Sequence, residues 1–98
     1  MFDKMKALMD MQKKMQEMKR ELDAANFDVQ SHDGLVKITM NGSQEVKEVI
    51  IRENFKETEK STLEKAIKDA YNIAIKRSHD IAASKMKDIT GFNLPGLV

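Results

Sequence analysis

Alternating apolar and polar positions in the middle of the chain predict three β-strands. In residues 26–32, Phe27 and Val29 share one face, and the next apolar positions continue the same period of two. Residues 45–52 begin with this alternation and then become apolar on both faces. The residues expected to form the core and a dimer contact are Val36, Ile38, Met40, Val49, Ile50 and Ile51.

Two dipeptides on either side of the second strand predict tight turns. Asp33-Gly34 precedes this strand and Asn41-Gly42 follows it. Both pairs are preferred in two-residue hairpin loops, whose central residues need positive φ angles. We therefore expect residues 26–52 to form an antiparallel meander of three strands.

Helical periodicity flanks the strands. Residues 61–90 carry an apolar stripe with a period of 3.6 residues, a capping-box sequence at Ser61–Glu64 and a stop signal at Gly91. The apolar tail, residues 91–98, is expected to dock at a place that the pattern does not define. Residues 1–25 carry a narrower seam at spacings of three and four, made of Leu8, Met11, Met15, Met18, Leu22 and Ala25.

This methionine-rich seam has two interpretations. The favoured one is packing against the other helix, and the alternative is a flexible groove for client peptides. The lengths add a second expectation: the helices would be roughly 35 and 43 Å long, whereas strands of about six residues span roughly 20 Å. The helices should therefore project as a paired arm, and the sheet should complete its core against a second copy. We expect a single α+β domain that forms a homodimer.

Composition removes several classes of protein. The 98 residues contain no cysteine, so a disulfide framework, a thiolate metal site and a cysteine nucleophile are all excluded. No apolar run approaches the roughly 20 residues of a membrane span, so we expect a soluble intracellular protein without a membrane partner. The net charge of +1 is too small to indicate a partner by itself.

Candidate catalytic groups are sparse. Ser-His-Asp occurs as consecutive residues at 31–33 and 78–80, but neighbours on a strand or a helix diverge and cannot form a triad. The two histidines lack metal-ligand spacing, and no glycine-rich loop opens a helix. We expect no enzyme activity, no cofactor, no metal and no small-molecule substrate.

The basic residues of the two predicted helices follow a regular spacing. Lys6, Lys13 and Arg20 recur every seven residues opposite the seam of the first helix, with Lys14 and Lys19 beside them. On the second helix, the positions opposite the apolar stripe include Lys65, Lys68, Lys76 and Lys87, with Asp69 at the edge. Such rows are suited to DNA phosphates, whose contacts give affinity without sequence readout. The alternative is the ordinary charged face of a soluble helix.

Four segments carry a resemblance to a known family. They are the Met- and Lys-rich opening 1–18, the block Gly34–Gly42 with Glu45–Val49 after it, the segment Ala70–Ala74, and the ending Thr90–Leu97. In these the chain resembles the YbaB/EbfC family of bacterial nucleoid-associated proteins over nearly its full length. The resemblance implies a homodimer with sheets joined across the two-fold axis and helical arms splayed like tweezers. It also implies binding to double-stranded DNA with little or modest sequence preference, in the cytoplasm at the nucleoid.

Two functional hypotheses follow. The first is a non-enzymatic, dimeric DNA-binding protein whose helical arms contact phosphates. The second is a protein-interaction module that holds a partner with the Met-rich first helix and the apolar tail. The DNA-binding residues predicted by the first hypothesis are Lys6, Lys13, Lys14, Lys19, Arg20, Lys65, Lys68, Lys76 and Lys87.

Overall fold

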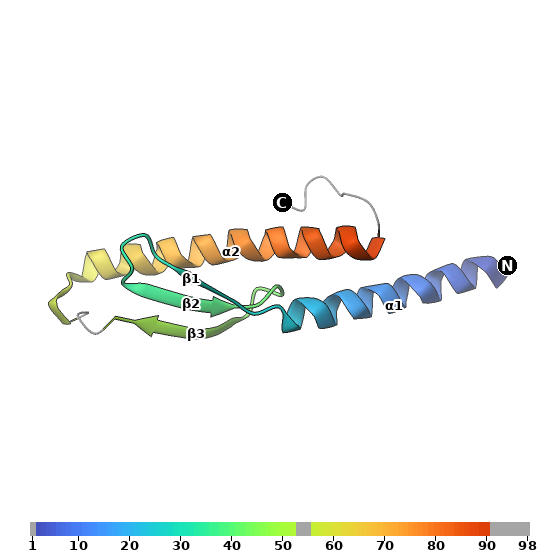
Figure 1. The fold of residues 1–98 in the computed structure, drawn as a ribbon, viewed down its shortest axis with the longest axis horizontal. Coiled ribbons are helices and arrows are strands. Elements are labelled where there is room, and N and C mark those ends of the chain that lie inside the picture. Colours follow the sequence, from blue (N-terminus) through green and yellow to red (C-terminus); the bar gives the residue numbers. More distant parts are fainter. Residues whose placement is uncertain (1, 53–55, 91–98) are drawn as a thin grey trace.

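The computed structural model describes residues 2–52 and 56–90 and consists of two long helices and a small sheet. The tail, residues 91–98, lies outside the described residues. The elements, in chain order, are α1 (Phe2–Ala24), β1 (Phe27–Gln30), β2 (Val36–Met40), β3 (Val46–Ile51) and α2 (Lys60–Thr90) (Figure 1). The α+β layout predicted from the sequence, a long helix, a three-strand antiparallel sheet and a second long helix, is confirmed.

The sheet has the order β1-β2-β3, and both neighbouring pairs are antiparallel. Val29 lies opposite Ile38, which in turn lies opposite Val49, so these three side chains share one face. The register shifts between Thr39 and Met40, where β3 has one residue more than β2. The face of the sheet that contains Val29 and Ile38 packs against α2.

Small residues on α2 let it lie close to the sheet. Ala66, Ala70 and Ala74 follow one another at intervals of four and are all buried. Opposite them are the alternate residues of β2, of which Val36 and Met40 are fully buried and Ile38 nearly so. Since every second residue of β2 faces α2, the alternation read from the sequence corresponds to the packing in this strand.

β3 is different, because α2 covers β1 and β2 but leaves β3 open. All six residues of β3 are exposed, including Val49, Ile50 and Ile51, which belong to the set predicted for the core and a dimer contact. Within the described part of the chain, these three apolar side chains are therefore 39–50% exposed.

Both turns differ from the predicted two-residue hairpins. In the first, Gly34 has the expected positive φ of 73°, but Asp33 does not, and the amide of Gly34 donates to the carbonyl oxygen of Ser31. In the second, the positive φ of 65° belongs to Gln44 and not to Gly42. Both loops are therefore longer than predicted. Gly34 follows its turn as a left-handed residue, and Gly42 has a different role.

The start of α2 also differs from the prediction. The amide of Leu63 donates to the carbonyl oxygen of Glu59 at 3.1 Å, and the helix begins at Lys60. Ser61 thus lies inside the first turn and does not cap it. The capping box predicted at Ser61–Glu64 is wrong, because the helix starts two residues earlier than that motif requires.

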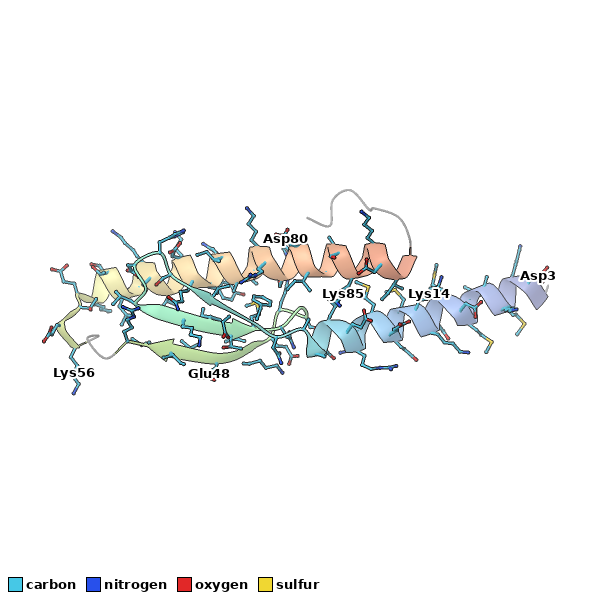
Figure 2. The ribbon with its side chains drawn as sticks, viewed as in Figure 1. Asp3, Lys14, Glu48, Lys56, Asp80 and Lys85 are labelled. Carbon is cyan, nitrogen blue, oxygen red and sulfur yellow. The ribbon has the colours of Figure 1, made fainter. Side chains whose placement is uncertain are left out.

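The predicted helix seam holds along only part of α1. Its last turns contact α2: Met18 and Leu22 are half-buried, and Lys85 Nζ lies 4.0 Å from Glu21 Oε2. Beyond this contact α1 continues past the end of α2, and Figure 2 shows side chains projecting around this free length. Leu8, Met11 and Met15 are 56–65% exposed. Packing of these three residues against α2 was a wrong expectation, since α2 ends before it reaches them.

The result is an elongated molecule. Its principal extents are 67 × 23 × 16 Å, and its radius of gyration is 18.1 Å. A compact domain of this size would have a radius of gyration of about 13 Å. The long dimension comes from α1 and α2, which extend in the same direction beyond the sheet (Figure 1).

Candidate nucleic-acid interface

The outer side of α2 carries a row of cationic side chains. Because Ala66, Ala70 and Ala74 face the sheet, residues half a turn away face solvent. All the predicted cations of this helix lie on that side and are exposed. We call them the α2 lysine row: Lys65, Lys68, Lys76 and Lys87. Within the described residues no member of this row forms an ion pair.

One carboxylate lies at the edge of this row and is held by the sheet. Asp69 Oδ2 accepts a hydrogen bond from the backbone N–H of His32 at 2.7 Å and lies 2.8 Å from His32 Nδ1. The hydrogen bond from the His32 backbone is the largest cause that lowers the pKa of Asp69, and the imidazole lowers it further. His32 is exposed, as expected for a turn residue, but it is also paired and joins the β1–β2 turn to α2.

Another cation of α2 is directed to the sheet. Arg77 Nη1 donates to the backbone carbonyl oxygen of Asp28 at 3.1 Å, and its guanidinium carbon lies 5.8 Å from the centroid of the Phe27 ring. Sequence reasoning assigned Arg77 no role. A signal was available, because on a helical wheel Arg77 lies nearer to the apolar stripe than to the α2 lysine row.

The cations of α1 have more mixed surroundings. Lys6, Lys13 and Arg20, which we call the α1 cation row, are exposed and face away from α2. Each of them follows a carboxylate by three residues, so a parallel acidic line runs beside the row. That line consists of Asp3, Asp10 and Glu17.

The two remaining predicted cations of α1 do not belong to its row. Lys14 precedes Glu21 by two helical turns and so lies on the side of α1 that faces α2. Lys19 Nζ lies 3.0 Å from Asp23 Oδ2. The pKa of Asp23 is lowered first by the hydrogen bond from the Ser43 hydroxyl and then by that from Lys19. Asp23 also places this end of α1 against the β2–β3 loop.

The predicted cations therefore form two separate sets. The four on α2 share one continuous face, whereas those on α1 are spread around the helix. The rows on α1 and α2 point away from each other, because each lies opposite the surface through which its helix packs. Within one chain, the structure does not combine them into a single patch.

The two Ser-His-Asp runs do not form triads. The Ser31 hydroxyl donates to Asp33 at 2.6 Å, while the His32 ring contacts Asp69. In the second run, Ser78 is buried and donates to the carbonyl oxygen of Ile75, and its two neighbours are exposed. The described residues also contain no cluster of three or more potential metal ligands.

The sheet presents an apolar surface beside α2. On β3, Val46, Val49 and Ile51 are 39–50% exposed. They lie on the same face of the sheet as Ile38, which is the face that α2 covers at β1 and β2. On α2, Ile67 and Tyr71 lie on the flank opposite the one that contacts β1, and they are 41% and 45% exposed. We call these five residues the open apolar patch.

Fold and surface together define a class of small α+β proteins in which one long helix covers part of a three-strand meander and a second projects freely. Residues 1–93 match the model of the YbaB/EbfC DNA-binding family. The chain therefore belongs to this family of nucleoid-associated DNA-binding proteins, which is not a family of enzymes. None of the helices in the described residues is long and apolar enough to cross a membrane.

A solved structure has the same fold. The uncharacterized protein HP0035 from Helicobacter pylori superposes with a TM-score of 0.68, and the match covers 92% of each chain. The sequences are 19% identical, so this likeness concerns the fold alone.

Proposed function

We propose that this chain is a non-enzymatic nucleoid-associated protein of the bacterial cytoplasm. In this proposal it binds double-stranded DNA as a homodimer, through phosphate contacts and with little or modest sequence preference. Membership of a DNA-binding family supports the choice of ligand. The mode of binding and the dimer rest on the surfaces described above.

The observation that carries the proposal is the α2 lysine row. Its members extend from Lys65 to Lys87, a distance of roughly 33 Å along the helix. They have no ion pair within the described residues, so their ammonium groups are available to phosphate oxygens. Phosphate contacts from lysines give affinity that depends on salt and little on sequence.

The α1 cations contribute less in this proposal. The acidic line beside the α1 cation row repels phosphates at nearly the distance at which the cations attract them. Lys14 and Lys19 lie on other sides of α1, and Lys19 already has a carboxylate partner. The DNA contact is therefore assigned mainly to α2, with Lys6, Lys13, Lys14, Lys19 and Arg20 as secondary contacts.

The open apolar patch supports the homodimer. Val49 and Ile51 lie at the edge strand of the sheet, and Ile67 and Tyr71 face the same open space from α2. Antiparallel pairing of β3 with β3 of a second copy would join the sheets around a two-fold axis perpendicular to them. Both α2 helices would then lie on the same face of the joined sheet, one on either side of the two β3 strands, and the two lysine rows would lie on the same side of the dimer.

A gel-shift titration at two salt concentrations, with a defined duplex and a random duplex, tests the proposal. We expect similar affinity for both duplexes and a marked loss of affinity at the higher salt concentration. Binding that is insensitive to salt, or an absence of binding at low salt, would overturn the phosphate mode.

The exposed Met seam favours a second candidate, the protein-interaction module. Leu8, Met11 and Met15 offer an apolar stripe that α2 does not cover. The apolar tail that would share this role lies outside the described residues. A partner that is retained in a pull-down after nuclease treatment, and lost when Met11 and Met15 become polar, would support this candidate.

A further inference from the structure

The two edges of the sheet are not equivalent. β1 and β3 are both edge strands, and an edge strand presents unpaired N–H and C=O groups to which another strand can add. The contacts of Arg77 make the β1 edge different from the β3 edge.

Hydrogen bonding between β1 and β2 shows which groups of β1 point outward. The amide of Ser31 donates to the carbonyl oxygen of Val36 at 2.9 Å, so this pair is hydrogen-bonded. Such pairs alternate along an antiparallel ladder. Val29 therefore bonds to β2, whereas the backbone groups of Asp28 and Gln30 point away from the sheet.

Arg77 occupies this outward side of β1. Its Nη1 donates to the carbonyl oxygen of Asp28 at 3.1 Å, which is the bond that a further strand would otherwise make. The guanidinium lies over the Phe27 ring at 5.8 Å, a cation–π distance, so its position is fixed by a second contact. The Asp28 side chain is also engaged, because it accepts from Thr39 Oγ1 at 2.6 Å.

The β3 edge has no such cover. The amide of Arg52 donates to the carbonyl oxygen of Leu35 at 2.9 Å, and by the same alternation the outward groups belong to Val49 and Ile51. Among residues 2–52 and 56–90, no side chain bonds to these groups. The open edge therefore coincides with the open apolar patch, whereas the closed edge is the one that Arg77 covers.

We infer that Arg77 closes the β1 edge against strand addition and thereby directs assembly of the sheet to β3. Without its guanidinium, β1 becomes a second docking edge for another copy of this chain. This inference rests on the proposed dimer, because a molecule that uses both edges would form an open chain of subunits instead of a closed pair.

Sedimentation velocity over a wide range of protein concentration tests the inference with Arg77→Met and Arg77→Gln. Methionine keeps an apolar stem on Phe27 and removes the hydrogen-bond donor. Glutamine keeps a donor but is too short to reach the carbonyl oxygen of Asp28. Both substitutions remove the same bond, so the test needs only one of the two variants to fold. The matched control is Lys76→Met, which removes the same charge from the solvent side. We expect the wild type and the control to keep one size, and the Arg77 variants to form larger species whose mass at least doubles as concentration rises.

A third change identifies the edge that is used. Gln30→Pro removes an outward N–H without breaking a bond to β2, and proline is tolerated at such an edge position. In the Arg77→Met background it should restore the wild-type size. Arg77 variants that sediment like the wild type, or larger species that persist with Gln30→Pro, would overturn the inference. A wild-type monomer would instead reject the proposed dimer. In that case, larger species of the Arg77 variants would still support closure of the β1 edge, and Arg77 variants that stay monomeric would overturn it.

Discussion

Leu22 and Gly42 meet where α1 ends and the β2–β3 loop turns. The amide of Gly42 donates to the carbonyl oxygen of Leu22 at 3.0 Å. A Cβ atom on residue 42 would stand 2.9 Å from Leu22 Cδ2 and 3.2 Å from the Leu22 carbonyl oxygen. The glycine therefore permits a close approach that attaches the first helix to the sheet.

Gly42→Ala should reduce the free energy of unfolding by about 1–3 kcal/mol, the usual cost of overpacking. Urea denaturation measures this change. Gly34 supplies the control, because its constraint is a positive φ of 73° and not a lack of space. Asparagine tolerates that φ, so Gly34→Asn should cost less than Gly34→Ala, whereas Gly42→Asn should cost more than Gly42→Ala. Wild-type stability of Gly42→Ala would contradict the contact described here.

These two glycines mark how far the sequence could predict the fold. The order of elements and the buried face of β2 follow from periodicity, because a period of two allows only one set of side chains to face α2. The turn sequences predicted where the chain reverses but not how. Asn41-Gly42 resembles a two-residue turn, yet Asn41 is fully buried and its side chain bonds to the loop and to the carbonyl oxygen of Asp23. Contacts to a distant helix are not encoded in a dipeptide.

The same reason explains the seam of α1. Its spacing correctly predicted a helix with one apolar side, and Met18 and Leu22, beside the contact between α1 and α2, are half-buried. Periodicity contains no information on where the partner helix ends, so it could not distinguish the covered residues from Met11 and Met15, which are exposed.

The ionisation of the Asp69 carboxyl group should make the stability of the fold depend on pH. Its pKa is lower in the folded chain than in the unfolded one, chiefly because of the hydrogen bond from the His32 backbone. The ionised carboxylate thus stabilises the fold fully above the unfolded value of about 3.9. This contribution is lost as the pH falls through the lower, folded pKa. Asp69→Asn should therefore weaken the loss of stability in acid.

Urea denaturation between neutral pH and about pH 3 measures the effect on Asp69. Asp80→Asn is the matched control, since it removes the same charge from an exposed position on the same helix. An acid profile of Asp69→Asn that is indistinguishable from the wild-type profile would reject this role of the His32–Asp69 contact.

The free length of α1 should tolerate polar substitutions. Met11 and Met15 are 64% and 56% exposed, so Met11→Gln and Met15→Gln together should change the free energy of unfolding by less than about 0.5 kcal/mol per site. Leu22→Ala, at the covered end, should cost clearly more. Thermal unfolding compares the double Met variant and Leu22→Ala with the wild type. Severe destabilisation by the two Met changes would mean that this stripe is covered in solution.

A substitution of Val49 tests the proposed dimer contact through the oligomeric state. Val49→Lys places like charges near the two-fold axis of the proposed dimer, where the open apolar patches meet. We expect light scattering to report a single chain of 11.2 kDa for this variant and twice that mass for the wild type. Gln30→Lys, on the other edge strand, should remain dimeric. A dimer in both variants would exclude β3 as the contact.

The candidate site was predictable in part. Opposition to the apolar stripe was enough to assign Lys65, Lys68, Lys76 and Lys87 to one exposed face. It could not identify Arg77 as a contact to β1 or Asp69 as a partner of His32, because both contacts join segments far apart in the sequence. The line of Asp3, Asp10 and Glu17 was visible in the sequence, and its spacing of seven matches that of the α1 cation row.

The most direct test of the account is the salt dependence of DNA affinity after charge reversal on α2. Lys65→Glu, Lys68→Glu and Lys76→Glu are combined and compared with a control of equal net charge that reverses the exposed Lys4, Lys56 and Lys60, which lie outside the α2 lysine row and outside β3. The α2 variant should bind every duplex more weakly, and each lost phosphate contact should flatten the slope of log K against log salt by about 0.9. An α2 variant that keeps the affinity and slope of the wild type would contradict the assignment of DNA binding to this face.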